Sequence, residues 1–222
     1  MAKFQVVEKF VSINGEGTLS GQLSTFIRFK GCNLNCSFCD TKWANGEVAG
    51  YSEENEFEIY KYIKDSGVKN VTLTGGEPLY RDNMRVLLKL LGVDENLRVE
   101  IETNGSVDLT PYMDESDNIT FTMDYKLPGS GMEDKMFVDN LKILRKKDTV
   151  KFVVGSEFDL KRAKMIIDEY NLIGKCNIYL SPVFGKIDPA NIVEFMKENH
   201  LNNVNLQLQL HKFIWDPKKR GV

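Results

Sequence analysis

Short runs rich in β-branched and aromatic residues alternate along the chain with longer stretches of helical periodicity. The strand-like runs are Ser24–Lys30, Asn70–Thr74, Arg98–Thr103, Ile119–Asp124, Thr149–Val154, Asn177–Leu180 and Val204–Leu210. The helical periodicity falls at 53–66, 82–91, 134–146, 158–170 and 189–199. In the first of these, Phe57, Tyr60 and Ile63 have the spacing of a half-buried helix face. In the last, Pro189 after Asp188 is a helix start signal.

Alternating strands and helices predict parallel strands joined by right-handed crossovers, and therefore an α/β fold. A closed eightfold barrel usually needs about 250 residues. This chain has 222 residues, and part of it forms the N-terminal and cysteine-bearing loops. We therefore expect an incomplete TIM-like barrel of about six β/α units, within a single domain spanning residues 1–222.

Polar motifs follow five of the predicted strands. They are TGGEP after NVTL, ETNG at the end of RVEI, DYK after ITFTM, SPVF after NIYL, and HK after VNLQLQL. In parallel barrels the carboxyl ends of the strands meet at the face where active sites are built. One such coincidence has little weight because loops are polar anyway. Five in succession predict a single active site at the C-terminal ends of the strands.

Cys32, Cys36 and Cys39 form a C-x3-C-x2-C loop, whereas Cys176 stands alone. Such a tight triplet is typical of a metal or cluster site rather than of a secreted disulfide framework. Structural zinc needs a fourth protein ligand, and a fully ligated [4Fe–4S] cluster uses four cysteines. No other Cys or His lies in this window, so a cluster with one open iron fits the ligand count better. A zinc knot completed by His211, or three unrelated core thiols, remain as alternatives.

Composition excludes several classes of protein without naming a function. The net charge of −3 argues against a broad, non-specific nucleic-acid surface. No run approaches the ~18 uncharged apolar residues needed to span a bilayer. The first residues lack the uninterrupted apolar core of a signal peptide. We therefore expect a cytoplasmic protein with neither a nucleic acid nor a membrane as its partner.

With Phe38 before its last cysteine, the C-x3-C-x2-C loop resembles that of the radical S-adenosylmethionine (SAM) enzymes. The resemblance implies that Cys32, Cys36 and Cys39 bind one [4Fe–4S] cluster, whose open iron takes the amino and carboxylate groups of SAM. Radical chemistry of this kind belongs to the cofactor, and the protein supplies orientation and protection.

A closer resemblance covers nearly the whole chain. Its motifs are FVSINGEG at 10–17, FIRFKGCNL at 26–34, CDT at 39–41, TGGEP at 74–78, ETNG at 102–105, DYK at 124–126 and LQLHKFIW at 208–215. Together they are similar to those of the 7-carboxy-7-deazaguanine synthase family, although GGEP and CDT alone also occur in related activases. The resemblance implies ring contraction of 6-carboxy-5,6,7,8-tetrahydropterin to 7-carboxy-7-deazaguanine with release of ammonia, in queuosine and 7-deazapurine biosynthesis.

The same resemblance implies cofactors and partners. Reductive cleavage of SAM yields a 5′-deoxyadenosyl radical that takes hydrogen from C6 of the pterin. The hydrogen returns later, so that SAM acts as a cofactor. Mg²⁺ assists the reaction. A flavodoxin or ferredoxin is the implied electron donor, and a homodimer is the implied assembly.

The resemblance also assigns residues to the site. The implied SAM-binding residues are Phe38, Cys39, Asp40, Gly76, Glu77, Asp124, Tyr125, Lys126, Ser181, Pro182, Val183 and Phe184. The implied substrate-binding residues are Ile13, Asn14, Gly15, Arg28 and Thr74, with Thr41 as a ligand of Mg²⁺. The N-terminal segment is thus expected to contact the substrate. The chain departs from the family pattern at Asn14, where Gln is more usual, and at Phe184, where a polar residue is sometimes found.

The chemistry of these residues suits such roles but also suits ordinary ones. Gly75 and Gly76 allow a close backbone approach to a ligand, and Arg28 suits bidentate capture of a carboxylate. Thr41 offers the neutral oxygen that Mg²⁺ accepts. Taken alone, TGGEP equally fits a strand-to-helix turn, Arg28 a packed surface arginine and Thr41 a helix cap.

Two other functions remain open from the sequence. A glycyl-radical-enzyme activase shares the small size and the cluster loop but acts on a protein partner, and many carry inserted cysteine-rich cluster domains that this sequence lacks. A non-catalytic zinc-binding module predicts a colourless zinc protein with no affinity for SAM.

Overall fold

A nine-stranded sheet forms the centre of the protein, for which a computed structural model describes residues 1–46, 48–81 and 83–222. Its strands are β1 (Phe4–Ile13), β2 (Leu23–Phe29), β3 (Ser52–Glu54), β4 (Asn70–Gly75), β5 (Arg98–Thr103), β6 (Ile119–Tyr125), β7 (Thr149–Val154), β8 (Asn177–Pro182) and β9 (Val204–Leu206). They lie in the order β3-β1-β2-β4-β5-β6-β7-β8-β9. β1 pairs antiparallel with β2 and β3, and all other pairs are parallel.

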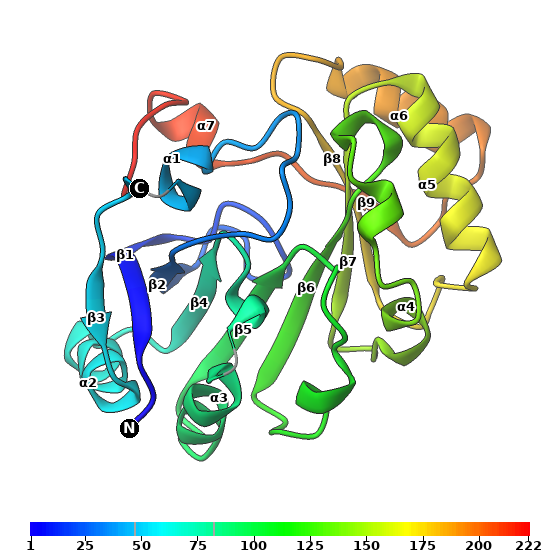
Figure 1. The fold of residues 1–222 in the computed structure, drawn as a ribbon. Helices are drawn as coiled ribbons and strands as arrows, with labels where there is room; N and C mark the ends of the chain where they lie inside the picture. The colour runs from blue at the N-terminus through cyan, green and yellow to red at the C-terminus, as the bar shows by residue number, and fades with distance from the viewer. Residues whose placement is uncertain (47, 82) are drawn as a thin grey trace.

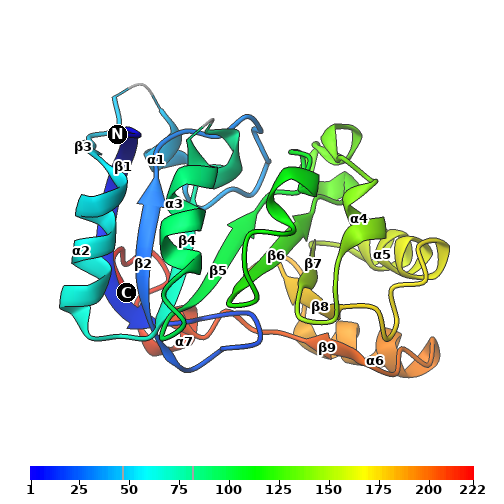
Figure 2. The same cartoon turned by 90° about the horizontal axis from the view of Figure 1, so that it is seen from below.

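Helices of very different length connect these strands. The α-helices are α1 (Lys42–Asn45), α2 (Glu56–Ser66), α3 (Met84–Gly92), α4 (Asn140–Ile143), α5 (Glu157–Glu169), α6 (Pro189–Glu198) and α7 (His211–Ile214). Short 3₁₀ turns are η1 (Pro78–Tyr80), η2 (Thr110–Tyr112), η3 (Pro128–Ser130) and η4 (Glu133–Lys135). The longer helices α2, α3, α5 and α6 lie along the outside of the curved sheet (Figures 1 and 2).

The predicted incomplete barrel is confirmed. Seven parallel strands, β2 and β4 to β9, follow one another through six crossovers, and the sheet does not close because β3 and β9 are its two edges. Within the described ranges, no helix is long and apolar enough to cross a membrane.

Several local predictions differ from the structure. β1 was not predicted, because its half-buried residues show no clean alternation of apolar and polar positions. α2 begins at Glu56 rather than 53, since the Asn55 side chain accepts from the N–H groups of Phe57 and Glu58 in a capping box. The helix expected at 134–146 is broken into η4 and α4. The last strand ends at Leu206, and the next residue, Gln207, binds the N-terminal turn through its side chain.

The two faces of the sheet differ in chemistry. One set of alternate strand positions joins helix residues in a single apolar core, including Ile27, Leu73, Ile101, Phe121 and Phe152. The other set is polar and includes Thr72, Thr74, Glu100, Glu102, Thr122, Asp124 and Lys151. Parallel strands covered on both faces usually read as continuous apolar runs. Here the inner face is polar. We call the space lined by this polar set of side chains the barrel interior.

Candidate functional site

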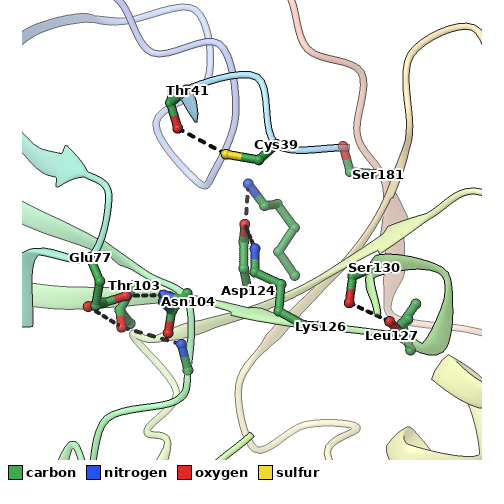
Figure 3. A network of polar contacts seen from close by, with 12 residues as sticks. Cys39, Thr41, Glu77, Thr103, Asn104, Asp124, Lys126, Leu127, Ser130 and Ser181 are labelled. Carbon is green, nitrogen blue, oxygen red and sulfur yellow. Dashed lines mark hydrogen bonds and ion pairs between the residues drawn. The ribbon is translucent and has the colours of Figure 1, made fainter. Parts of the chain in front are cut away.

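The cysteine loop leaves β2 and is anchored to the turn that follows β6. The Ser37 N–H donates to the Ser130 carbonyl at 3.0 Å, and the Ser37 hydroxyl donates to the Gly129 carbonyl at 2.8 Å. The free thiol of Cys36 is buried, and those of Cys32 and Cys39 are partly exposed. In Figure 3 the Cys39 thiol points toward Thr41, and Asp124 and Lys126, which act electrostatically on the Cys36 thiol, lie below it. The predicted cluster loop and the DYK motif are therefore brought together.

The chemistry of the three thiols fits an iron–sulfur cluster. The thiols of Cys32, Cys36 and Cys39 interact electrostatically with one another, so the three side chains lie near each other. Cysteine thiolates are the usual protein ligands of iron–sulfur clusters, in which each thiolate binds a separate iron. The donor set thus fits a cluster with three protein ligands.

Hydrogen bonds reach the sulfur of Cys32 from two directions. The Leu34 N–H donates to it at 3.4 Å, and Asn104 Nδ2 donates to it at 3.5 Å. Asn104 Nδ2 also donates to Asn33 Oδ1 at 3.0 Å, so the ETNG motif is bonded directly to the cysteine loop. Donors to a ligand sulfur stabilise negative charge there and tune the potential of a cluster.

Glu77 of the TGGEP motif is fully buried and joins the ends of two strands. Its Oε1 accepts from Leu79 N at 3.0 Å and from Thr103 Oγ1 at 2.8 Å, and its Oε2 accepts from Asn104 N at 2.6 Å (Figure 3). Burial raises the pKa of Glu77 to about 7, although these donors favour the ionised form. Glu77 therefore fixes the position of Asn104 beside the cluster loop.

The paired glycines of TGGEP lie against the chain itself. A side chain on Gly75 would meet the backbone of Phe29, and one on Gly76 would meet the carbonyl of Gly31 and the side chain of Asn45. Gly76 N donates to the Phe29 carbonyl at 3.1 Å. The structure therefore shows a close approach that requires glycine, to the strand that enters the cysteine loop, and an approach to a ligand stays a prediction.

A chain of ion pairs crosses the barrel interior. Lys126 Nζ lies 3.0 Å from Asp124 Oδ2, and Lys151 Nζ lies 3.0 Å from Asp124 Oδ1 and 3.1 Å from Glu16 Oε2. Burial disfavours the charge on Asp124, but the two lysines hold the pKa of this carboxyl below its usual value. Ser181 Oγ also donates to Glu16 Oε1 at 3.0 Å. Charged groups from the N-terminal turn, β6 and β7 thus meet the Ser181 hydroxyl of β8 at one site.

Two further carboxyl groups lie deeper in the barrel interior. Glu100 accepts from Thr122 Oγ1 at 2.5 Å and from Asn14 Nδ2 at 3.3 Å. Burial, reinforced by the neighbouring Glu102, raises the pKa of Glu100 to about 7. Burial also raises the pKa of Glu102, which is hydrogen-bonded to Thr74. With a pKa of about 7, Glu100 can hold or release a proton near neutral pH.

The N-terminal turn that was predicted to contact the substrate borders this interior. Asn14 Oδ1 accepts from Thr72 Oγ1 at 2.9 Å, and the Gly15 carbonyl accepts from Leu210 N at 3.1 Å. Gly17 N donates to Gln207 Oε1 at 2.7 Å, and Gln207 Nε2 donates back to the Gly17 carbonyl at 3.2 Å. The turn is therefore held by residues that follow β9.

The remaining predicted substrate residues lie on neighbouring strands. Arg28 on β2 and Thr74 on β4 are direct partners in the parallel pairing of these strands. Arg28 Nε donates to Glu8 Oε1 at 2.7 Å, which orients the guanidinium group. Ile13, the last residue of β1, is half-buried. Arg28 and Thr74 lie near the carboxyl ends of their strands, where the cysteine loop begins, whereas Ile13 pairs with Leu23 at the start of β2.

Some of the predicted SAM residues face the barrel interior, whereas others lie in the apolar core or in the cysteine loop. Asp124, Lys126 and Ser181 face the interior, whereas the Tyr125 ring packs on Phe152 in the core at 5.6 Å. Burial raises the pKa of Tyr125 to about 12. Pro182, the last residue of β8, and Val183 after it are buried, and Phe38 is half-buried in the cysteine loop.

Aromatic and charged contacts link the rest of the SPVF motif to α7. The exposed Phe184 ring meets Phe213 edge-on at 6.2 Å, and Lys212 Nζ lies 5.6 Å from the centroid of the Phe184 ring. Lys212 Nζ also pairs with Asp40 Oδ2 at 3.3 Å. α7 is thereby connected to the cysteine loop.

Sequence reasoning missed Glu16, Glu100, Glu102 and Lys151 as members of the site. For Glu100, Glu102 and Lys151 the signal is the pattern within the strands, because NVTLT, RVEIET and TVKFVV place a polar residue at every second or central position. In a parallel strand covered on both faces, such positions would be apolar. Polar residues at inward positions therefore mark the barrel interior as well as its rim. Glu16 lies in the turn between β1 and β2, where no such pattern indicates it.

Comparison with known proteins gives consistent matches. The model of the radical SAM superfamily matches residues 26–124. Over 219 residues the chain is 62% identical to the 7-carboxy-7-deazaguanine synthase of Clostridium acetobutylicum, covering 99% of each chain. It is 37% identical to the protein of that name from Methanospirillum hungatei, covering 96% of this chain and 86% of the relative. For the one from Leptospira interrogans the identity is 34%, with 99% and 98% covered.

A solved structure supports the fold. The crystal structure of QueE from Escherichia coli superposes with a TM-score of 0.73 at 23% identity, covering 93% of this chain and 94% of that one. The full-length sequence matches and the cysteine loop at the rim of a polar barrel interior show the family. The chain belongs to the 7-carboxy-7-deazaguanine synthase family of the radical SAM superfamily.

Proposed function

We propose that this protein converts 6-carboxy-5,6,7,8-tetrahydropterin to 7-carboxy-7-deazaguanine with release of ammonia, in queuosine or 7-deazapurine biosynthesis. The observation that carries the proposal is the placement of three cysteine thiols beside a barrel interior lined by charged side chains. The full-length identity to proteins named for this activity supports it. As a radical SAM protein, the chain uses a [4Fe–4S] cluster and SAM.

Cys32, Cys36 and Cys39 would hold the [4Fe–4S] cluster, which when bound would supply the electron for the reductive cleavage of SAM. The partly exposed pair of Lys126 and Asp124 offers a cation and an anion to the amino-acid and ribose groups of SAM. Tyr125 contributes through its backbone, because its ring lies in the core. The loop Ser181–Phe184 borders the same side of the site.

Substrate recognition falls to the N-terminal turn and to β2 and β4. Arg28 supplies a guanidinium for the pterin carboxylate, and Thr74 lies beside it on the next strand. Ile13, Asn14 and Gly15 form the wall provided by the turn. The buried carboxyl groups of the interior suit the amino and imino donors of a pterin ring, since each such donor needs an acceptor when buried.

The remaining proposals concern Mg²⁺, assembly and location. We propose Thr41 as a ligand of Mg²⁺; its Oγ1, a neutral oxygen of the kind that Mg²⁺ accepts, lies 3.5 Å from the sulfur of Cys39, which supports this role. We also propose that residues 1–222 act as one domain, that the protein is a cytoplasmic homodimer, and that a flavodoxin or ferredoxin reduces it.

An anaerobic assay tests the function. After iron–sulfide reconstitution, the protein is incubated with reductant, SAM, Mg²⁺ and 6-carboxytetrahydropterin, and the products are measured by mass spectrometry. We expect 7-carboxy-7-deazaguanine from the unaltered protein and from Cys176→Ala, and none from Cys36→Ala. Cys36 and Cys176 are matched controls because each is 8% exposed, so packing loss is similar in both variants.

The products also separate this function from the alternatives. If 5′-deoxyadenosine forms without the deazaguanine, the substrate is wrong and a protein substrate becomes the next candidate. A colourless protein that retains zinc and does not bind SAM would contradict the enzyme assignment altogether.

A further inference from the structure

We propose that Lys151 is a positioning residue that holds Glu16 of the substrate turn and Asp124 of the SAM site in a fixed relation, so that SAM cleavage stays coupled to product formation. The inference rests on the proposed function. It assigns a role to a side chain that no motif of the sequence singled out.

The geometry places Lys151 between the two halves of the site. Its ammonium lies 3.1 Å from Glu16 Oε2 and 3.0 Å from Asp124 Oδ1, and the residue is only 6% exposed. Glu16 belongs to the turn between β1 and β2, next to the proposed substrate residues. Asp124 lies near the end of β6 and pairs with Lys126 through its other oxygen at 3.0 Å. One cation thus bridges two carboxylates with different proposed ligands.

A buried lysine in the centre of a strand is not accounted for by stability alone. Removing a charge from water is costly, and a well-packed apolar residue often stabilises such a position equally well or better. Burial opposes the charge, yet Asp124, Glu16 and Glu102 hold the pKa of Lys151 well above its ordinary value. The ammonium therefore stays charged at neutral pH and acts through position rather than as a base.

The other contacts of Glu16 show why Lys151 has the largest effect on the position of the Glu16 carboxylate. Ser181 Oγ donates to Glu16 Oε1 at 3.0 Å, and Gln209 Nε2 lies 3.4 Å from Oε2. Both are neutral donors. Among the described residues, Lys151 is the cation that forms an ion pair with Glu16. Without it, the carboxylates of Glu16 and Asp124 would face each other with no intervening positive charge.

Loss of Lys151 is therefore expected to move the substrate turn relative to the SAM site. Misplacement of about 1 Å between reacting groups can reduce a rate by about 100-fold. The radical would then form without the pterin hydrogen in reach, and SAM would be consumed without yielding the deazaguanine. The ratio of 5′-deoxyadenosine to 7-carboxy-7-deazaguanine reports this uncoupling and does not depend on the fraction of correctly folded protein.

The experiment compares Lys151→Met, Lys151→Arg and Lys175→Met with the unaltered enzyme, each reconstituted to the same iron content. Lys175 is the matched control because its ammonium donates to the carbonyls of Leu141 and Lys142. We expect Lys151→Met to raise the ratio of 5′-deoxyadenosine to product at least about tenfold. Lys151→Arg, which keeps the cation, should recover most of the coupling, and Lys175→Met should leave the ratio unchanged.

A double-mutant cycle identifies the partner. If Lys151 acts through Glu16, adding Lys151→Met to Glu16→Gln should change the ratio far less than Lys151→Met alone, because residues in contact are not additive. An unchanged ratio in Lys151→Met, with the unaltered enzyme making the deazaguanine, would overturn this inference alone. Absence of product from the unaltered enzyme would instead overturn the proposed function.

Discussion

Asn104 Nδ2 donates a hydrogen bond to the sulfur of Cys32 at 3.5 Å, and the orientation of its amide is determined by Ser106. The Ser106 N–H can only donate, so the Asn104 oxygen must face it at 2.9 Å and the amide nitrogen must face the sulfur. Glu77 holds the Asn104 backbone at 2.6 Å. Asn104 of the ETNG motif is thus preorganised to donate a hydrogen bond to the sulfur of Cys32.

Removing this donor should make the cluster harder to reduce. A hydrogen bond to a thiolate favours the reduced cluster, which carries more negative charge. In Asn104→Ala we expect a more negative midpoint potential, with an EPR-monitored redox titration shifting by about 59 mV if the equilibrium changes tenfold. Asn33→Ala is the control, because it leaves the Asn104–sulfur bond in place. Equal midpoints in Asn104→Ala and the unaltered protein would contradict the prediction.

Gly76→Ala should destabilise the protein before any ligand binds. Its new methyl group would meet the Gly31 carbonyl and the Asn45 side chain at the entrance to the cysteine loop. Overpacking of this kind costs about 1–3 kcal/mol, which urea unfolding monitored by circular dichroism would detect. Gly46→Ala serves as the control because an added Cβ meets nothing within 4 Å there. Similar unfolding midpoints for the two variants would show that the Gly76 contact tolerates a side chain.

The buried carboxyl of Glu100 should make the unfolding free energy depend on pH. Burial raises its pKa from 4.5 to about 7, so between these values the folded protein binds more protons than the unfolded chain. Stability must then fall as the pH rises from 4.5 through 7, by about 3 kcal/mol for this group. Glu100→Gln should flatten that decline in a series of urea titrations. A decline as steep as in the unaltered protein would mean that Glu100 is already ionised.

Thr41→Val should abolish the response to Mg²⁺. The substitution preserves the shape of the side chain but removes the hydroxyl that lies 3.5 Å from the Cys39 sulfur. We expect Mg²⁺ to raise product formation by the unaltered enzyme and to have no effect on the variant, as measured in metal-free buffer with added MgCl₂. Thr110→Val, in the remote turn η2, should behave as the unaltered enzyme does. A normal Mg²⁺ response in Thr41→Val would assign the ion to other ligands.

Local patterns in the sequence predict much of the fold. The strands that carry TGGEP, ETNG and DYK can be located because their hydrophobic runs end in recognisable polar motifs. The cysteine loop can be located because three thiols at such short spacing are typical of a metal or cluster site. β1 cannot, since a strand that is half-buried along its length has no clear period.

Other features depend on contacts that no local pattern shows. Glu16 and Lys151 pair across 135 positions of sequence, and nothing near either residue indicates the other. The reason for glycine at position 76 is likewise found only in the folded structure, where the backbone of Gly31 leaves no room for a side chain. Tyr125 shows the reverse case: it lies within a motif, yet its ring turns to the core because side chains alternate along a strand.

The pair of hydrogen bonds between Gly17 and Gln207 affects the order in which parts of the protein fold during synthesis. The two residues are separated by 190 positions, so the turn leaves the ribosome long before its partner is made. Domains fold as they emerge, and contacts between distant parts of a chain form late. The strands up to β8 can therefore pair first, while the N-terminal turn is fixed only after β9 and Gln207 have been translated.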